Sequence, residues 1–328
     1  MSGSEDELMQ HPLLMIPGPI EFHEDVLHKL SLPTLAHTDP QFINEFGETL
    51  EMLRQIFLTK TGQPFVLSGS GVLTWDIAVS NLMEKDDKAL VITTGYFGDR
   101  FAQCFQTYGH TPTILRPSTV GDAPTLDELA DTLKSKGPFK VVTITHVETS
   151  TGVKCDVHAF SKVIQQHSPG ALIVVDGVCS IGGEELRMDE WGVDLAITAS
   201  QKALGCPPGL AIVTASQRAL KVIKERKTPI PNYYANLANW LPVMEAMEGR
   251  KPAYFATPAV NLVRALHTSA KQILQSGLEA RFHQHAQTAT RIRGALKALG
   301  LKLVTVRGDI TSNLMTAIYL PEGVQATA

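Results

Sequence analysis

The sequence has few cysteines, no long hydrophobic run and little net charge. Its four cysteines are far apart and form no CxxC pair, so neither a disulfide framework nor a zinc site is expected. No apolar run approaches the roughly 20 residues that a membrane-spanning helix needs. The formal net charge is -4 over 328 residues, which gives no basis for binding a nucleic-acid backbone.

The first residues lack the features of a leader peptide. Residues 2–7 are polar and acidic. Secretory signals need an apolar core behind a basic start, and mitochondrial presequences are rich in arginine and poor in acids. We therefore expect a soluble intracellular protein without a signal peptide or transmembrane segment.

Short apolar runs rich in valine and isoleucine recur between residues 63 and 214. Because they show little polar alternation, they predict strands that are covered on both faces, as in a mostly parallel sheet sandwiched by helices. The seven predicted strands are residues 64–67, 89–93, 112–115, 139–145, 171–175, 194–198 and 210–214. Between them, a capping box at residues 125–128 and the apolar spacing of residues 157–167 predict helices. This alternation predicts an α/β fold.

The pattern changes after residue 214. Longer helices are expected at residues 260–278 and 280–299, followed by strand-like runs at 302–307 and 314–320. We therefore expect an N-terminal arm (1–20), a large domain (21–278) and the start of a small, incomplete α+β domain (279–328).

Two motifs with a possible role in ligand binding follow predicted strands, at the edge where open α/β sheets bind ligands. The turn at residues 68–71 has the sequence SGSG and precedes a helix, so its amides could approach a phosphate, although such turns are also common simple connections. Asp176 ends a buried apolar strand. Its carboxylate either caps the next turn or needs a cationic partner, such as a protonated pyridine nitrogen.

Two further motifs follow other strands. Lys202 is flanked by small and apolar residues between two predicted buried strands, where a lysine can act as a nucleophile toward an aldehyde. Phe97 offers a ring that could lie on a planar cofactor, although a core position is the alternative. An anion-binding turn, an aromatic ring, a carboxylate and a lysine together are what pyridoxal 5′-phosphate (PLP) requires.

With these motifs the sequence resembles the class V aminotransferases, which are PLP enzymes of fold type I. Within that family it is similar to the alanine–glyoxylate and serine–pyruvate aminotransferases, and residues 189–194 and 236–240 resemble their fungal branch. The resemblance runs from residue 16 to at least residue 258. The blocks that carry it are SGSG (68–71), THVETSTG (145–152), VDGVCSIGG (175–183), SQKA (200–203), PPG (207–209) and FATP (255–258).

The resemblance implies a role for each candidate site residue. Lys202 would bind the cofactor covalently and then move a proton between substrate and cofactor, and Asp176 would keep the pyridine nitrogen protonated. The other cofactor contacts in the same chain would be Ser70, Gly71, Val72 and Gln201 at the phosphate, Phe97 and Val178 on the ring faces, and Thr149 near O3′. The family usually has a tryptophan at the position of Phe97, so stacking should be weaker here. No metal is expected.

The resemblance also implies a homodimer with shared active sites. Tyr254 and Thr257 would reach the phosphate bound by the neighbouring subunit, and the arm around Gly18 would lie near the substrate pocket. The family's substrate-carboxylate arginine belongs to an Arg-x-Gly segment expected after residue 328, and Arg307 comes too early to take its role. We therefore expect a shortened chain or weaker binding of substrate carboxylates. A peroxisomal signal could be lost with that segment, which leaves cytoplasm or peroxisome as the compartment.

The activity implied is transfer of an amino group from alanine or serine to glyoxylate, giving pyruvate or hydroxypyruvate and glycine. A phosphoserine aminotransferase or cysteine desulfurase relative would use the same lysine. The desulfurase is disfavoured because no cysteine lies in an obvious C-terminal loop. A catalytically silent PLP-fold scaffold is the alternative outside enzymes, and a nucleotide-binding Rossmann protein is disfavoured because no GxGxxG follows the first strand.

Overall fold

The computed structural model describes residues 13–324 and contains a seven-stranded sheet. The strands are β1 (Gln63–Ser68), β2 (Ala89–Ile92), β3 (Thr113–Leu115), β4 (Val141–Thr145), β5 (Leu172–Asp176), β6 (Leu195–Ala199) and β7 (Leu210–Ala215). Their ends differ from the predicted ranges by two residues at most. All except β3 are buried along almost their whole length, because apolar runs of this kind are covered on both faces.

The strands are arranged in the order β1-β7-β6-β5-β4-β2-β3. Only β7 runs antiparallel to its neighbours β1 and β6, and the other neighbouring strands are parallel. The predicted, mostly parallel sheet is thus confirmed. As a consequence, β1, β2, β4, β5 and β6 all end at the same edge, where ligands bind in sheets of this type.

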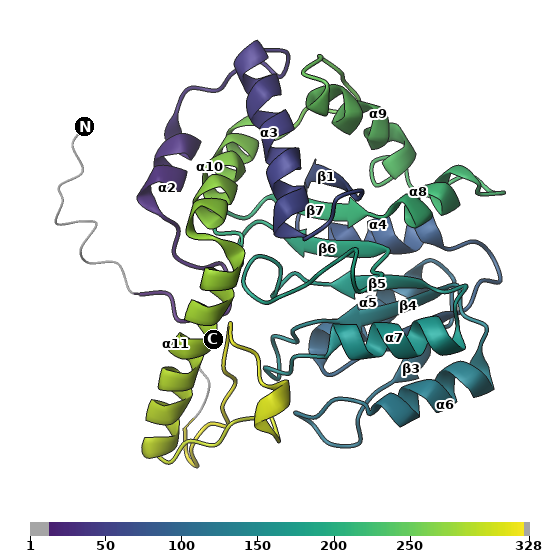
Figure 1. Ribbon diagram of the computed structural model, residues 1–328, viewed down its shortest axis with the longest axis vertical. Helices are drawn as coiled ribbons and strands as arrows, with labels where there is room; N and C mark the ends of the chain where they lie inside the picture. Colours follow the sequence, from purple (N-terminus) through teal and green to yellow (C-terminus); the bar gives the residue numbers. More distant parts are fainter. Residues whose placement is uncertain (1–12, 325–328) are drawn as a thin grey trace.

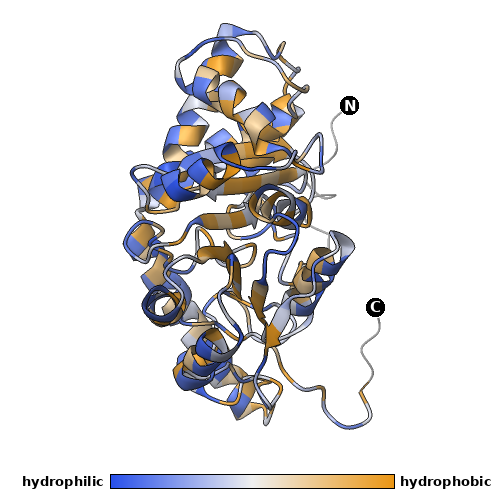
Figure 2. Cartoon of the chain, turned by 90° about the vertical axis from the view of Figure 1, so that its right-hand side faces the viewer, coloured by the Kyte–Doolittle hydropathy of each residue, from blue (hydrophilic) through white to orange (hydrophobic). Residues whose placement is uncertain are grey.

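Helices cover both faces of the sheet (Figure 1). The helices of the described residues are α2 (Glu24–Ser31), α3 (Pro40–Ile56), α4 (Leu73–Leu82), α5 (Tyr96–Thr107), α6 (Leu126–Lys136), α7 (Val157–His167), α8 (Gln217–Lys224), α9 (Leu237–Glu248), α10 (Val260–Ser276) and α11 (Leu278–Ala298), of which α2 and α11 lie beside the sheet and pack on α10. Helices α4 and α5 pack together on one face, α6 and α7 pack on the other, and α3 and α9 cover the β1 end. Figure 2 shows hydrophobic strands inside these largely hydrophilic helices.

Two helices begin where the sequence predicts. The Oγ1 atom of Thr125 accepts a hydrogen bond from the Glu128 amide at 3.2 Å, and the Glu128 carboxylate accepts one from the Thr125 amide at 2.8 Å. This reciprocal pair is the predicted capping box, and it satisfies N–H groups that the first turn of α6 leaves free. The helix predicted at residues 157–167 is α7.

The prediction of two strands after α11 is wrong. Residues 302–307 and 314–320 contain a single antiparallel bridge, between Leu303 and Ile318, and the short 3-10 helix Gly308–Ile310 lies between them. These segments are mostly exposed or half-buried, so they lack the covered surface that favours continuous strands. The division into arm, large domain and small domain stays a prediction. Within residues 13–324, no helix has both the length and the apolar character needed to span a membrane.

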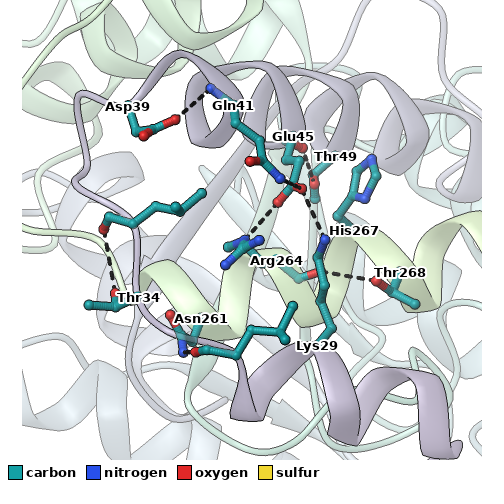
Figure 3. A network of polar contacts seen from close by, with 12 residues as sticks. Lys29, Thr34, Asp39, Gln41, Glu45, Thr49, Asn261, Arg264, His267 and Thr268 are labelled. Carbon is teal, nitrogen blue, oxygen red and sulfur yellow. Dashed lines mark hydrogen bonds and ion pairs between the residues drawn. The ribbon is translucent and has the colours of Figure 1, made fainter.

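A buried ion-pair network joins α2, α3 and α10 (Figure 3). Arg264 of α10 is only 4% exposed, and its Nε donates a hydrogen bond to Oε2 of Glu45 in α3 at 2.9 Å. The other oxygen of Glu45 accepts hydrogen bonds from Lys29 in α2 and from Gln41, both at 3.0 Å. The network therefore fixes the N-terminal helices α2 and α3 against α10.

We predict that Glu45→Ala lowers the free energy of unfolding by about 3–5 kcal/mol, because Arg264 would then be buried without its partner. Burial acts to raise the pKa of Glu45, but hydrogen bonds from Gln41, Lys29 and Arg264 outweigh it and leave the pKa below the ordinary value of 4.5. The stabilisation is therefore present above about pH 4.5 and lost as the pH falls through the folded-state pKa.

Urea unfolding at pH 7 and at pH 4 checks this prediction. A matched control is Glu51→Ala on the same helix, because the ion pair of Glu51 with Arg250 is largely exposed and should contribute no more than about 1 kcal/mol. Equal losses for the two variants at pH 7 would contradict the importance of the buried pair.

Candidate active site

A cavity of about 220 Å³ lies at the edge of the sheet where the parallel strands end. The structure brings nine of the eleven predicted site residues together around it. These are Ser70, Gly71, Val72, Phe97, Thr149, Asp176, Val178, Gln201 and Lys202. The lining also includes Gly18, Trp75, Thr145, Val147 and Cys179. The predicted residues thus share one cavity, and the sequence analysis did not single out Trp75, Thr145, Val147 or Cys179.

One end of the cavity is suited to an anion. Ser70, Gly71 and Val72 connect β1 to the first turn of α4. Within the described part of the chain, no hydrogen bond engages their backbone N–H groups. Free amides and the positive end of a helix attract phosphate. In the same lining, Oε1 of Gln201 is buried without a hydrogen-bond partner, so this acceptor is free for a donor group of a ligand and not for a phosphate oxygen.

Asp176 is the buried acid of the cavity. It ends β5, is 4% exposed, and accepts hydrogen bonds from Trp75 Nε1 at 2.8 Å and from the Val178 amide at 3.0 Å. Burial raises the pKa of its carboxyl to about 6, and the charge of Glu148 acts in the same direction. The two hydrogen bonds and the charge of Lys202 oppose this rise without cancelling it. A cation beside Asp176 would offset the remaining free-energy cost of keeping a charged carboxylate buried.

Trp75 orients this acid, and the sequence analysis did not find that role. The indole lies in α4 and stacks on Phe101 of α5, with ring centroids 5.3 Å apart and an interplanar angle of 12°. Packing thus fixes the ring that donates to Asp176. The two partners are 101 residues apart, so no local pattern in the sequence indicates their contact.

Lys202 lies in the loop between β6 and β7, which is held at several points. The hydroxyl of Ser269 in α10 donates to the Leu204 carbonyl, and Arg281 of α11 donates to the Ala203 carbonyl at 2.9 Å. Gly18 packs on the lysine itself. A Cβ atom at position 18 would lie 2.5 Å from Lys202 Cδ, and the positive φ of 134° also favours glycine there. The predicted position of the arm near the site agrees with this contact.

Phe97 and Thr149 approach the cavity from neighbouring strand ends. Phe97 is in the first turn of α5, and its ring meets Trp75 edge-on at 6.5 Å. Thr149 follows β4, where Thr145, Val147 and Thr149 alternate into the cavity as side chains of an extended chain do.

Tyr254 and Thr257 lie outside the cavity of their own chain. Their hydroxyl oxygens are 3.3 Å apart, and Tyr254 is 62% exposed. The structure therefore does not bring these two predicted residues together with the other nine.

The residues around the cavity fit PLP in each of its chemical parts. Free amides at the start of α4 match a phosphate, and a buried acid with a raised pKa matches a protonated pyridine. Phe97 and Val178 supply apolar walls, and Lys202 supplies the amine for an aldehyde.

A larger cavity of about 790 Å³ does not coincide with this site. It lies between α6, α7 and the residues after α11, and none of the eleven predicted residues lines it. Arg307 lines this larger cavity and is paired with Asp122 and Asp309, so it does not face the smaller cavity.

Comparison with known proteins agrees with the geometry. The model of the Aminotransferase class-V family matches residues 34–318. Alanine–glyoxylate aminotransferase 1 of Saccharomyces cerevisiae is 40% identical, over 94% of this chain and 83% of the relative. L-aspartate–glyoxylate aminotransferase of Paracoccus denitrificans is 35% identical, over 97% and 78%.

A solved structure supports the same assignment. The crystal structure of alanine–glyoxylate aminotransferase from Nostoc sp. superimposes with a TM-score of 0.87 at 29% identity, covering 99% of this chain and 85% of that one. The predicted fold of type I PLP enzymes is thereby confirmed. The match of the family model to most of the chain, together with these relatives, shows that the chain belongs to the class V aminotransferases, a family of PLP-dependent enzymes.

Proposed function

We propose that this chain binds PLP through Lys202 and transfers an amino group from a small α-amino acid, alanine or serine, to glyoxylate. The products are pyruvate or hydroxypyruvate, and glycine. The observation that carries the proposal is a buried acid, Asp176, in the same small cavity as Lys202 and a helix N-terminus with free amides. This set satisfies the separate needs of a phosphate, a cationic ring and an aldehyde.

When bound, PLP supplies an electron sink for the charge that develops at the substrate Cα. The side chains and amides of the protein bind the cofactor, orient it and transfer the proton. Lys202 would hold the cofactor through its Nζ, and its amine would move a proton at the substrate Cα. Asp176 would pair with a protonated pyridine nitrogen, and the hydrogen bond from Trp75 fixes the orientation of that carboxylate, which lines the cavity. The amides of residues 70–72 would hold the phosphate, and Thr149 would donate to the ring oxygen.

Glyoxylate is proposed as acceptor because the named relatives share it, whereas their donors differ between alanine and aspartate. A small donor fits the size of the cavity and the glycines in its wall, Gly18 and Gly71. A side chain at either position would take up space beside Lys202 or Val178.

The catalytic unit in this proposal is a homodimer. Tyr254 and Thr257 lie outside their own cavity and are hydrogen-bonded to each other, so we assign them to the phosphate of a second copy. Exposed apolar side chains at the cavity support an interface there, among them Val72 in its lining and Tyr96 next to Phe97. Apolar surface of this kind is typical of contacts between subunits.

The alternative of a desulfurase is not supported by the cysteines. Such chemistry needs a mobile, reactive thiol, whereas Cys155, Cys179 and Cys206 are buried. Burial raises the pKa of Cys179 to about 11 and that of Cys155 and Cys206 to about 12. Cys104 lies on α5 and contacts Asp76. Thiols with such pKa values are poor nucleophiles.

Absorbance spectroscopy tests the proposed function. We expect purified protein with PLP to show the visible band of lysine-bound cofactor, to lose that band with L-alanine, and to recover it with glyoxylate. A band that ignores alanine, serine and glyoxylate would reject the activity while leaving the cofactor assignment intact.

Lys202→Ala should abolish the lysine-bound band and reduce transamination by roughly 10²–10⁴-fold or more, because no other amine lines the cavity among the described residues. Lys162→Ala, at an exposed position of α7, is the control and should match the wild type in both measurements. A normal band in the Lys202 variant would refute its role.

Asp176→Asn should change both the pH dependence of stability and the activity. The raised pKa means that the charged carboxylate destabilises the folded, cofactor-free protein above about pH 6, and that this cost declines as the pH falls toward the ordinary value of 3.8. The variant removes this cost, which is roughly 3 kcal/mol at pH 8 and less at pH 5, but its amide NH2 must then face the Trp75 or the Val178 donor. The stability of the variant relative to the wild type should therefore be higher at pH 8 than at pH 5. Transamination should fall by roughly 10²-fold or more, because a neutral amide does not favour the protonated ring.

Urea unfolding of the cofactor-free proteins at the two pH values, with rates measured on the PLP-loaded forms, checks both effects. Wild-type turnover in the variant would exclude the proposed pairing of Asp176 with the ring nitrogen.

A further inference from the structure

A second buried carboxylate lies directly behind the cavity. Glu148 follows β4 between Val147 and Thr149, both of which line the cavity. Glu148 itself does not line it and is 0% exposed. Because neighbouring side chains of an extended segment point to opposite sides, Glu148 points away from the position expected for the cofactor ring. A buried acid that touches no ligand needs another reason to carry charge.

Four hydrogen-bond donors compensate the charge of Glu148. They belong to two segments, residues 94–98 and residues 148–151. Oε2 of Glu148 accepts hydrogen bonds from the amides of Phe97 at 3.0 Å and Gly98 at 3.2 Å, in the first turn of α5. Oε1 accepts from the amide of Ser150 at 3.0 Å and from its hydroxyl at 2.8 Å. No cationic side chain within residues 13–324 forms an ion pair with Glu148. The helix N-terminus and the loop amides therefore hold the carboxylate.

The two segments are packed closely around this carboxylate. The amide of Tyr96 donates to the Ser150 hydroxyl at 2.9 Å, and Thr151 donates to the Thr94 carbonyl at 3.2 Å. At Gly95 there is no room for a side chain, since a Cβ atom would lie 2.4 Å from Ser150 Oγ and 2.7 Å from Glu148 Cγ. The close packing of residues 94–98 against residues 148–151 thus depends on the glycine at position 95 and on the acid at position 148.

We infer that Glu148 is a positioning residue for the cofactor, because it sets the distance between Phe97 and Thr149 across the cavity. Phe97 belongs to the helix turn whose amides Glu148 accepts, and Thr149 is the neighbour of Glu148 in the loop. One carboxylate therefore fixes both a ring wall and the expected O3′ contact. The inference rests on the proposed function, since it concerns how PLP is held.

The charge of Glu148 has a second effect on the site. It helps to raise the pKa of Asp176, although burial is the larger cause. Two nearby negative charges favour a cation at the position expected for the pyridine nitrogen more strongly than Asp176 would alone. Glu148 therefore supports the site both geometrically and electrostatically, without contact with the substrate.

Glu148→Gln is the informative variant, because it retains size and polarity while replacing one acceptor oxygen by an amide that donates. That amide must face either the Phe97 and Gly98 donors or the Ser150 donors. In the cofactor-free protein, we expect faster hydrogen exchange in the peptides covering residues 93–101 and 146–152, measured by mass spectrometry. For PLP, we expect an affinity lower by roughly ten-fold or more and a weaker circular dichroism of the bound cofactor.

The matched control is Glu84→Gln. Glu84 accepts hydrogen bonds from the amides of Lys227 and Thr228 and from the Thr228 hydroxyl, a similar donor set remote from the cavity lining. This variant should leave PLP affinity, the cofactor's circular dichroism and exchange in the two peptides unchanged. Ser150→Ala removes one of the four donors to Glu148 together with the acceptor of the Tyr96 amide. It should reproduce the Glu148→Gln effects in weaker form and serves if that variant fails to fold.

The possible results distinguish the positioning role of Glu148 from the proposed PLP-dependent function. Wild-type exchange, affinity and dichroism in a folded Glu148→Gln protein would overturn the inference, as would unchanged values in Ser150→Ala when Glu148→Gln does not fold. If the wild type forms no lysine-bound PLP, the proposed function fails instead. Hydrogen exchange then still shows whether Glu148 holds the two segments together, since that measurement needs no cofactor.

Discussion

A carboxylate at the carboxyl end of β5, shielded from water, is the constraint on which the site depends. Asp176 is 4% exposed, and burial raises its pKa to about 6 even with two hydrogen bonds in place. Its position is tolerable only where a cation can approach, so the cavity beside it is part of the same arrangement. Trp75 limits the carboxylate to one orientation, and the stacking of Trp75 on Phe101 extends that control into the helical layer.

The topology of the sheet brings the other groups to this acid. Because β1, β2, β4, β5 and β6 all end at one edge, segments that are distant in sequence become neighbours there. Each strand end then contributes one kind of group: free amides after β1, an aromatic ring after β2, a hydroxyl after β4 and a lysine after β6. The buried pair of Arg264 and Glu45 fixes α10, whose Ser269 holds the lysine loop, so a network remote from the cavity supports it.

The sequence predicted features that depend on local pattern and missed those that depend on distant contacts. Continuous apolar runs predicted the seven strands, and the capping box at Thr125 predicted the start of α6, because both are properties of neighbouring residues. The run at residues 302–307 misled the same reasoning, since strand-like composition without a covered surface gives only the bridge from Leu303 to Ile318. Trp75 is 101 residues from Asp176, and Glu148 is 51 residues from Phe97. For Glu148, a signal was present, because it is an acid three residues after the buried strand β4, much as Asp176 is an acid at the end of the buried strand β5.

The two buried acids differ in how completely their charge is compensated, and this difference explains their separate roles. A carboxylate offers about four positions for accepting hydrogen bonds. Glu148 uses four, all to donors that belong to the fold, so it has no capacity left for a ligand. Asp176 accepts two and faces the cavity, so half of its capacity is free for a cationic ring. Because all acceptor positions of Glu148 are occupied by protein donors, this carboxylate holds the fold around the site. Because Asp176 has free acceptor positions that face the cavity, it is the carboxylate that can bind the cationic ring.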